Sequence, residues 1–118
     1  MSLNKQKIII IDDEQDLCFL LASRLSTYGF EVKAFDTLKE GLAGIATMKP
    51  DWVVVDNNLP DGLGWEENPK IELASPGVNI INISANPDSN RIYTGPHIHY
   101  LIKPINANSI VNLISNFS

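Results

Sequence analysis

The chain alternates between short apolar runs and longer segments in which apolar residues return every three or four positions. The first run, Ile8–Ile11, is a continuous stretch of β-branched residues, which is typical of a strand buried on both faces of a parallel sheet. Further runs of strand length lie at 30–35, 52–55, 78–83 and 98–102. The pattern therefore predicts five strands.

Three of the connecting segments have helical periodicity. Apolar residues at positions 17, 20, 21 and 25 predict a helix over 16–28, which Gly29 ends. Thr37 followed by Glu40 has the spacing of a capping box for a second helix, and Pro50 closes that helix. A last helix is predicted from about 106 to 117, because its apolar residues share one face.

The other two connections lack a regular helical pattern. Pro69 follows soon after Trp65, and a proline inside a helix removes a hydrogen bond and clashes with the preceding turn. We therefore expect the third helix to be short, displaced or broken. The segment 86–96 has no apolar stripe and contains two prolines and a glycine, so we expect a stub or a loop in place of a fourth helix.

Strands that alternate with helices indicate an α/β fold in which helices cover both faces of a parallel sheet. We predict a single domain over residues 1–118, with a doubly wound five-stranded parallel sheet and the flavodoxin-like strand order 2-1-3-4-5. A chain of 118 residues that is 44% hydrophobic can bury a core without disulfides. Its one cysteine, Cys18, excludes an intramolecular disulfide and is expected to pack inside a helix.

Charge and hydropathy narrow the possible partners. A formal net charge of −5 makes direct binding to nucleic acid or to an anionic membrane unfavourable. The apolar runs are too short to span a bilayer, and the N-terminal residues lack the apolar core of a signal peptide. We therefore expect a cytoplasmic protein that binds neither nucleic acid nor membrane.

The polar residues that could carry chemistry follow the carboxyl ends of predicted strands. They are Asp12, Asp13, Asp56, Ser84 and Lys103. In doubly wound sheets these ends share one edge, where ligands bind. Carboxylates ~4 Å apart repel by about 4 kcal/mol, so either one holds a proton or a cation binds among them. Oxygen ligands favour Mg²⁺ over Zn²⁺.

A lysine and a hydroxyl beside such a carboxylate would stabilise phosphoryl transfer onto it. These residues also have purely structural interpretations. Asp12, Asp13 and Glu14 would begin a loop and cap the first helix. Ser84 would be an ordinary strand-end serine, and Tyr100 would be half-buried core. The position of the acids and of Lys103 at matching strand ends favours the functional interpretation.

Four motifs lie in order along nearly the whole chain. They are Ile10-Ile11-Asp12-Asp13-Glu14, Val54-Val55-Asp56-Asn57-Asn58-Leu59-Pro60-Asp61-Gly62-Leu63-Gly64, Ser84-Ala85 and Tyr100-Leu101-Ile102-Lys103-Pro104. Any one of them is a weak signal. Together, in this order and spacing, they resemble the receiver domains of bacterial two-component response regulators.

The resemblance implies a phosphorylation site and a metal site. Asp56 would accept the phosphoryl group. Asp13, Asp56 and the backbone carbonyl of Asn58 would bind Mg²⁺, and Asp12 would hold a metal-bound water. The implied donor is a sensor histidine kinase or a phosphotransfer protein, and the domain would be a phosphoacceptor rather than an enzyme.

The same resemblance implies a switch. Ser84 would bond the phosphoryl group, Lys103 would pair with it across a bond to Pro104 that is often cis, and Tyr100 would swing inward when the hydroxyl moves. Asn58 and Asn86 occupy positions that control water access in the family, and neither is a strong base. We therefore expect no unusually fast self-dephosphorylation.

Two other functions stay open at this point. A pseudo-receiver would keep the fold as a protein-interaction module without phosphoryl transfer. A Mg²⁺-dependent phosphatase would need an aspartate pair with one residue between, whereas Asp12 and Asp13 are adjacent. The irregular segments 65–70 and 86–96 would alter the surface that usually reports phosphorylation, including the homodimer interface built on it.

Overall fold

The computed structural model describes residues 5–117, in which five parallel strands form one sheet. The strands are β1 (Lys7–Ile11), β2 (Glu31–Phe35), β3 (Trp52–Asp56), β6 (Asn79–Ser84) and β7 (Ile98–Ile102). Their order is β2-β1-β3-β6-β7, and every neighbouring pair is parallel. This is the predicted 2-1-3-4-5 order, because two short strands of a second sheet come before β6 in the chain.

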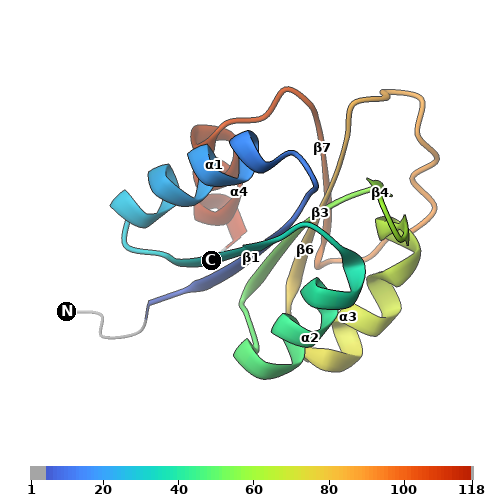
Figure 1. Cartoon of the computed structure of the whole chain (residues 1–118), viewed down its shortest axis with the longest axis horizontal. Helices are drawn as coiled ribbons and strands as arrows, with labels where there is room; N and C mark the ends of the chain where they lie inside the picture. The colour runs from blue at the N-terminus through green and yellow to red at the C-terminus, as the bar shows by residue number, and fades with distance from the viewer. Residues whose placement is uncertain (1–4, 118) are drawn as a thin grey trace.

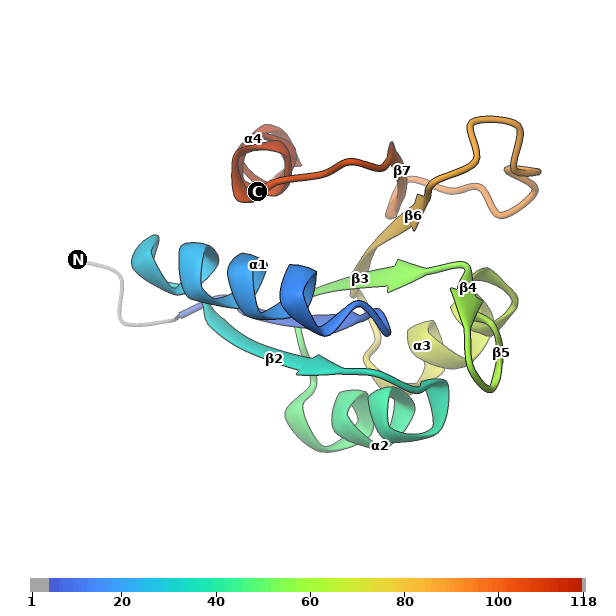
Figure 2. The same ribbon diagram turned by 45° about the horizontal axis from the view of Figure 1, so that its top comes forward.

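Helices cover both faces of the sheet, as Figures 1 and 2 show. Helices α1 (Gln15–Thr27) and α4 (Ala107–Phe117) lie on one face, and α2 (Leu38–Met48) and α3 (Asn68–Ala74) lie on the other. The run Ile8–Ile11 alternates between the two cores and is fully buried. Each of its side chains stabilises the fold by about 1.5–3 kcal/mol, which explains why no polar residue interrupts it.

The three helices with regular periodicity are present within a residue or two of their predicted bounds. The Thr37 hydroxyl caps α2 by accepting a hydrogen bond from the Glu40 amide at 3.2 Å. Gly29 follows α1 with φ of 95°, a conformation that glycine adopts without strain. Cys18 is buried in α1, as predicted.

The third helix is short, as predicted, but Pro69 does not interrupt it. A 3₁₀ turn, η1 (Gly64–Glu67), precedes the seven-residue α3, and Pro69 lies in the first turn of α3. The missing N–H of a proline costs no helical hydrogen bond there. Residues 85–97, all within the described part of the chain, form a loop without a helix, which confirms the second expectation.

A two-stranded hairpin that the sequence pattern did not predict follows β3. Strands β4 (Asn58–Leu59) and β5 (Gly62–Leu63) pair antiparallel. Asp61, in the turn between them, accepts hydrogen bonds from the amides of Leu38 at 2.8 Å and Lys39 at 3.0 Å. The hairpin therefore supplies a second cap to the N-terminus of α2, where negative charge is favourable.

Across residues 5–117, no helix combines the length and the apolar character that a membrane span requires.

Candidate functional site

The side chains predicted to form a site all lie at the carboxyl edge of the sheet. Asp56 ends β3 and Ser84 ends β6, while Asp12 directly follows β1 and Lys103 directly follows β7. The parallel register of these four strands aligns their ends. The Lys103 amide donates to the Ser84 carbonyl at 2.8 Å, so the lysine leaves the sheet beside the serine.

Three carboxylates face one another at this edge. Asp12, Asp13 and Asp56 each present an oxygen, and these three oxygens lie within 4.8 Å of one another. Asp12 and Asp56 are only 1% and 6% exposed, whereas Asp13 is exposed. The Glu14 amide donates to Asp12 Oδ1 at 3.0 Å, which fixes the orientation of that carboxylate.

Lys103 contacts this group of carboxylates. Among residues 5–117 it is the one positively charged side chain that does so. Its ammonium lies 2.9 Å from Asp12 Oδ2 and 3.4 Å from Asp56 Oδ1, and it also pairs with Glu14. Burial by itself would lower the pKa of Lys103, but hydrogen bonds to Glu14 and Asp12 and the charge of Asp56 raise that pKa above its ordinary value. The ammonium is therefore charged at neutral pH. The Lys103–Pro104 peptide bond is cis.

The local charge balance is negative. Burial raises the pKa of Asp56 to about 6, and the charge of Asp12 adds to this rise while Lys103 opposes it. One ammonium among these carboxylates leaves unbalanced negative charge, which a bound cation would relieve.

The donor set fits Mg²⁺. The three grouped side chains offer only carboxylate oxygens, which are hard ligands of the kind that Mg²⁺ takes. Asn58 lies two residues beyond Asp56, where it begins β4 and pairs with Leu63. The structure therefore brings together Asp12, Asp13 and Asp56, and the role of the Asn58 carbonyl as a further ligand stays a prediction.

The Ser84 hydroxyl is engaged by the loop that replaces a fourth helix. It accepts a hydrogen bond from the Asn86 amide at 3.0 Å and shares a second with the Ser89 hydroxyl at 2.9 Å. Ser84 itself is buried. Movement of this hydroxyl toward Asp56 would therefore disturb the first turn of the loop.

Tyr100, the predicted switch aromatic, connects η1 to the same loop. Its ring meets that of Trp65 edge-on, with ring centres 5.0 Å apart, and the Arg91 guanidinium lies 5.3 Å from its ring centre. Its hydroxyl donates to the Tyr93 carbonyl. Trp65 is buried and donates from Nε1 to the Ile83 carbonyl at 3.2 Å. A motion of Tyr100 would thus change contacts at both η1 and the loop.

Gly64 permits a close backbone approach to Asp56. A Cβ added at Gly64 would lie 2.0 Å from the Asp56 carbonyl oxygen, which no side chain could tolerate without a shift of the backbone. The Gly64 amide also donates to the Asn57 carbonyl at 2.9 Å. Glycine at this position therefore holds the β4–β5 hairpin close to the end of β3.

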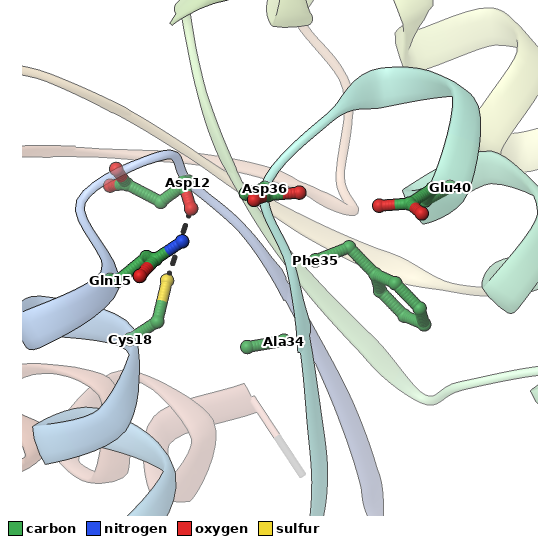
Figure 3. Close-up of a pocket in the computed structure, with 7 residues that line it drawn as sticks. All are labelled: Asp12, Gln15, Cys18, Ala34, Phe35, Asp36 and Glu40. Carbon is green, nitrogen blue, oxygen red and sulfur yellow. Dashed lines mark hydrogen bonds between the residues drawn. The ribbon is translucent and has the colours of Figure 1, made fainter.

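A cavity of about 290 Å³ opens next to the carboxylates (Figure 3). The Cys18 thiol in it donates to the Asp12 backbone carbonyl at 3.2 Å, and burial raises the pKa of this thiol to about 11. Figure 3 shows the Asp12 side chain directed away from Asp36 and Glu40, which line the other side of the cavity. Cys18 is thus a protonated packing residue outside the carboxylate group.

Sequence reasoning missed three participants at this edge. Glu14 contacts Lys103 from 89 positions away, and no local pattern could pair them. Ser89 lies in a segment without periodicity, and from sequence Trp65 indicates only a packing residue, which its burial confirms. The one available signal was the place of Glu14 directly after the two aspartates.

A doubly wound sheet with an acidic, lysine-containing edge defines a class of α/β proteins that bind ligands outside the carboxyl ends of their strands. Within this class, residues 8–115 match the family model of the response regulator receiver domain. The chain therefore belongs to the response regulator receiver domain family.

Curated relatives include transcriptional response regulators. The chain is 41% identical over 59 residues to the KDP operon transcriptional regulatory protein KdpE of Escherichia coli, a match that covers 50% of this chain and 26% of that protein. It is 25% identical over 114 residues to the DNA-binding response regulator MtrA of Mycobacterium tuberculosis, which covers 94% of this chain and 50% of that protein. The chain thus spans at most about half the length of these relatives.

Solved structures have the same fold. A receiver domain from Methylobacillus flagellatus superposes with a TM-score of 0.86 at 20% identity, covering 98% of this chain and 100% of that one. A two-component response regulator from Clostridium difficile superposes with a TM-score of 0.85 at 26% identity, covering 96% and 95%. These likenesses agree with the CheY-like flavodoxin fold that the strand order defines.

Proposed function

We propose that this receiver domain is a phosphoryl-accepting signalling switch and that Asp56 is its phosphoacceptor. The observation that carries the proposal is the meeting of three carboxylates within 4.8 Å of one another beside a lysine ammonium. Asp56 is the buried carboxylate that ends the central strand β3, and Lys103 contacts it directly. A group of perturbed charges in a cleft at strand ends is typical of a functional site.

Mg²⁺ is the cofactor that we propose for this site. Asp13, Asp56 and the Asn58 carbonyl would hold it, and Asp12 would bind one of its waters. When bound, the ion supplies positive charge that offsets the carboxylates and the incoming phosphoryl oxygens. Because this charge is required for the acceptor to meet an anionic donor, phosphorylation is expected to depend on Mg²⁺.

The proposed donor is a phosphohistidine on a sensor histidine kinase or a phosphotransfer protein. An oxygen of Asp56 attacks the phosphorus atom, a P–O bond forms as the P–N bond breaks, and the imidazole leaves with the electron pair. Lys103 pairs with a phosphoryl oxygen, and Ser84 donates its hydroxyl after releasing Ser89. The domain acts as an acceptor in its own phosphorylation and dephosphorylation, not as a multiple-turnover enzyme.

The effect on downstream partners depends on the whole protein. Relatives are named transcriptional or DNA-binding regulators, and this chain spans at most about half of their length. We propose that these 118 residues carry the switch, in the cytoplasm where a kinase can reach it, and that they do not contact nucleic acid themselves. The net charge of −5 supports that part of the proposal.

The test is phosphorylation by a small donor. The protein is incubated with acetyl phosphate, with and without Mg²⁺, and its intact mass is compared with that of Asp56→Asn. We expect a gain of one phosphoryl group that needs both Mg²⁺ and Asp56. An unchanged mass, together with no binding of Mg²⁺, would rule out the switch and leave a pseudo-receiver that acts as a protein-interaction module.

A further inference from the structure

We infer that Glu14 is a positioning residue that holds the Lys103 ammonium and competes for it with a phosphoryl group on Asp56. This inference rests on the proposed function. It names a residue that sets how readily the switch accepts and keeps its phosphoryl group.

Carboxylates already surround the Lys103 ammonium, and among residues 5–117 its side-chain hydrogen bond goes to Glu14. A lysine has three N–H donors, and three carboxylates surround this one: Asp12, Asp56 and Glu14. The contact with Glu14 is the shortest of the three. A phosphoryl oxygen on Asp56 would therefore compete most directly with Glu14, which accepts the hydrogen bond of this ammonium.

The three partners differ in what their release would cost. The Asp12 side chain is completely buried, and its other oxygen accepts the Glu14 amide, so an unpaired Asp12 would stay out of reach of water. Asp56 is the residue that reacts. The Glu14 side chain is 59% exposed, so water can hydrate its carboxylate once the contact with Lys103 breaks. Glu14 is thus the partner that Lys103 gives up most easily.

The local structure leaves Glu14 free for this role. It is the N-cap residue of α1, yet its side chain makes no capping hydrogen bond. The backbone amide of Glu14, rather than its side chain, is the group that orients Asp12. A change of the side chain should therefore alter the hold on Lys103 while the helix and the Asp12 carboxylate stay in place.

The test uses beryllofluoride, which mimics a phosphoryl group on a carboxylate, at saturating Mg²⁺. Its dissociation constant is measured by amide NMR for the wild type, Glu14→Gln and Asp16→Asn. Asp16 is an exposed acid in the first turn of α1, so Asp16→Asn removes the same charge nearby without touching Lys103. We expect Glu14→Gln to bind about three-fold more tightly, as the loss of a partly exposed ion pair would predict. Equal changes in the two variants would overturn the inference.

Two further readouts separate positioning from charge. In a Lys103→Met background, Glu14→Gln should no longer change the affinity, because the side chain acts through the ammonium. Without Mg²⁺ and beryllofluoride, the Lys103 ammonium protons should exchange with water faster in Glu14→Gln than in the wild type. An effect that persists without Lys103, or unchanged proton exchange, would refute the positioning role. If the wild type fails to bind beryllofluoride at all, the proposed function is what fails.

Discussion

The charge on Asp56 opposes folding when no cation is bound. Burial and the neighbouring Asp12 raise its pKa to about 6, well above the value of about 3.9 for an unfolded aspartate. The ionised side chain is thus less stable in the folded protein than in water. Under the proposed function, a bound cation and a phosphoryl group would relieve this unfavourable charge.

Replacing Asp56 by asparagine should therefore stabilise the protein in the absence of divalent ions. We expect Asp56→Asn to raise the free energy of unfolding by about 1–2 kcal/mol at pH 7 in EDTA, because the shape is kept and the charge is removed. Urea unfolding measures this change, and added Mg²⁺ should stabilise the wild type more than the variant. A variant less stable than the wild type in EDTA would show that the Lys103–Asp56 ion pair outweighs the repulsion.

Asp61 has the opposite electrostatic effect. Hydrogen bonds from the amides of Leu38 and Lys39 hold the pKa of its carboxyl below the ordinary value. Because the folded pKa is depressed, the stabilisation is complete above the unfolded pKa of about 3.9 and is lost as the pH falls through the lower folded value.

Asp61→Asn should accordingly be less stable than the wild type at pH 7, and the difference should shrink in acid. Thermal unfolding of both proteins between pH 7 and pH 2.5 measures it. Asp88→Asn is a suitable control, because Asp88 is exposed and its carboxylate accepts no hydrogen bond from another residue among residues 5–117. If the difference in thermal stability between the wild type and Asp61→Asn stayed constant down to pH 2.5, this would contradict the capping role.

At the scale of elements, a buried amide pair holds the short helix α3 on the sheet. The Asn68 and Asn82 side chains exchange two hydrogen bonds, of 3.0 and 2.8 Å, and both residues are almost completely buried. A helix of seven residues has little stability of its own, so this contact with β6 fixes its position.

Asn82→Ala should destabilise the protein by about 2–3 kcal/mol, since it removes two hydrogen bonds and leaves the Asn68 amide buried without a partner. Asn68→Ala together with Asn82→Ala should cost less than the sum of the single changes. Chemical denaturation measures the free energy of unfolding of the wild type, the two single variants and the double variant. Asn112→Ala, at an exposed position in α4, is the matched control. Additive losses would mean that the two amides do not depend on each other.

The sequence predicted elements that bury a regular pattern of side chains. The run Ile8–Ile11 has no polar position because both of its faces pack against helices. The residues of the site were found for a related reason: the carboxyl ends of parallel strands meet at one edge, so Asp12, Asp56 and Lys103 could be placed together from strand ends alone.

Features that depend on distant contacts were not predictable. Strands β4 and β5 have two residues each, too few to show a period. The Asn68–Asn82 pair joins a helix to a strand across the core, and Glu14 meets Lys103 only after the sheet has formed. Such contacts arise from tertiary packing, which periodicity does not encode.

At the scale of the whole molecule, the loop 85–97 links the site to a surface. Ser84 contacts its start through Ser89, and Tyr100 contacts its later part through Tyr93. Phosphorylation of Asp56 would draw on the Ser84 hydroxyl and so disturb the loop at its first turn. We therefore expect this loop, rather than a regular fourth helix, to report the state of the switch and to alter any homodimer that forms there.

The proposed switch requires Asp56 to be the residue that accepts the phosphoryl group. The most direct measurement is to phosphorylate the protein with acetyl phosphate and Mg²⁺, reduce it with borohydride, and sequence its peptides by mass spectrometry. Borohydride converts an aspartyl phosphate to homoserine and leaves a free carboxylate unchanged. We expect homoserine at position 56 and unchanged aspartate at positions 12 and 13. Homoserine at another aspartate, or at none, would contradict it.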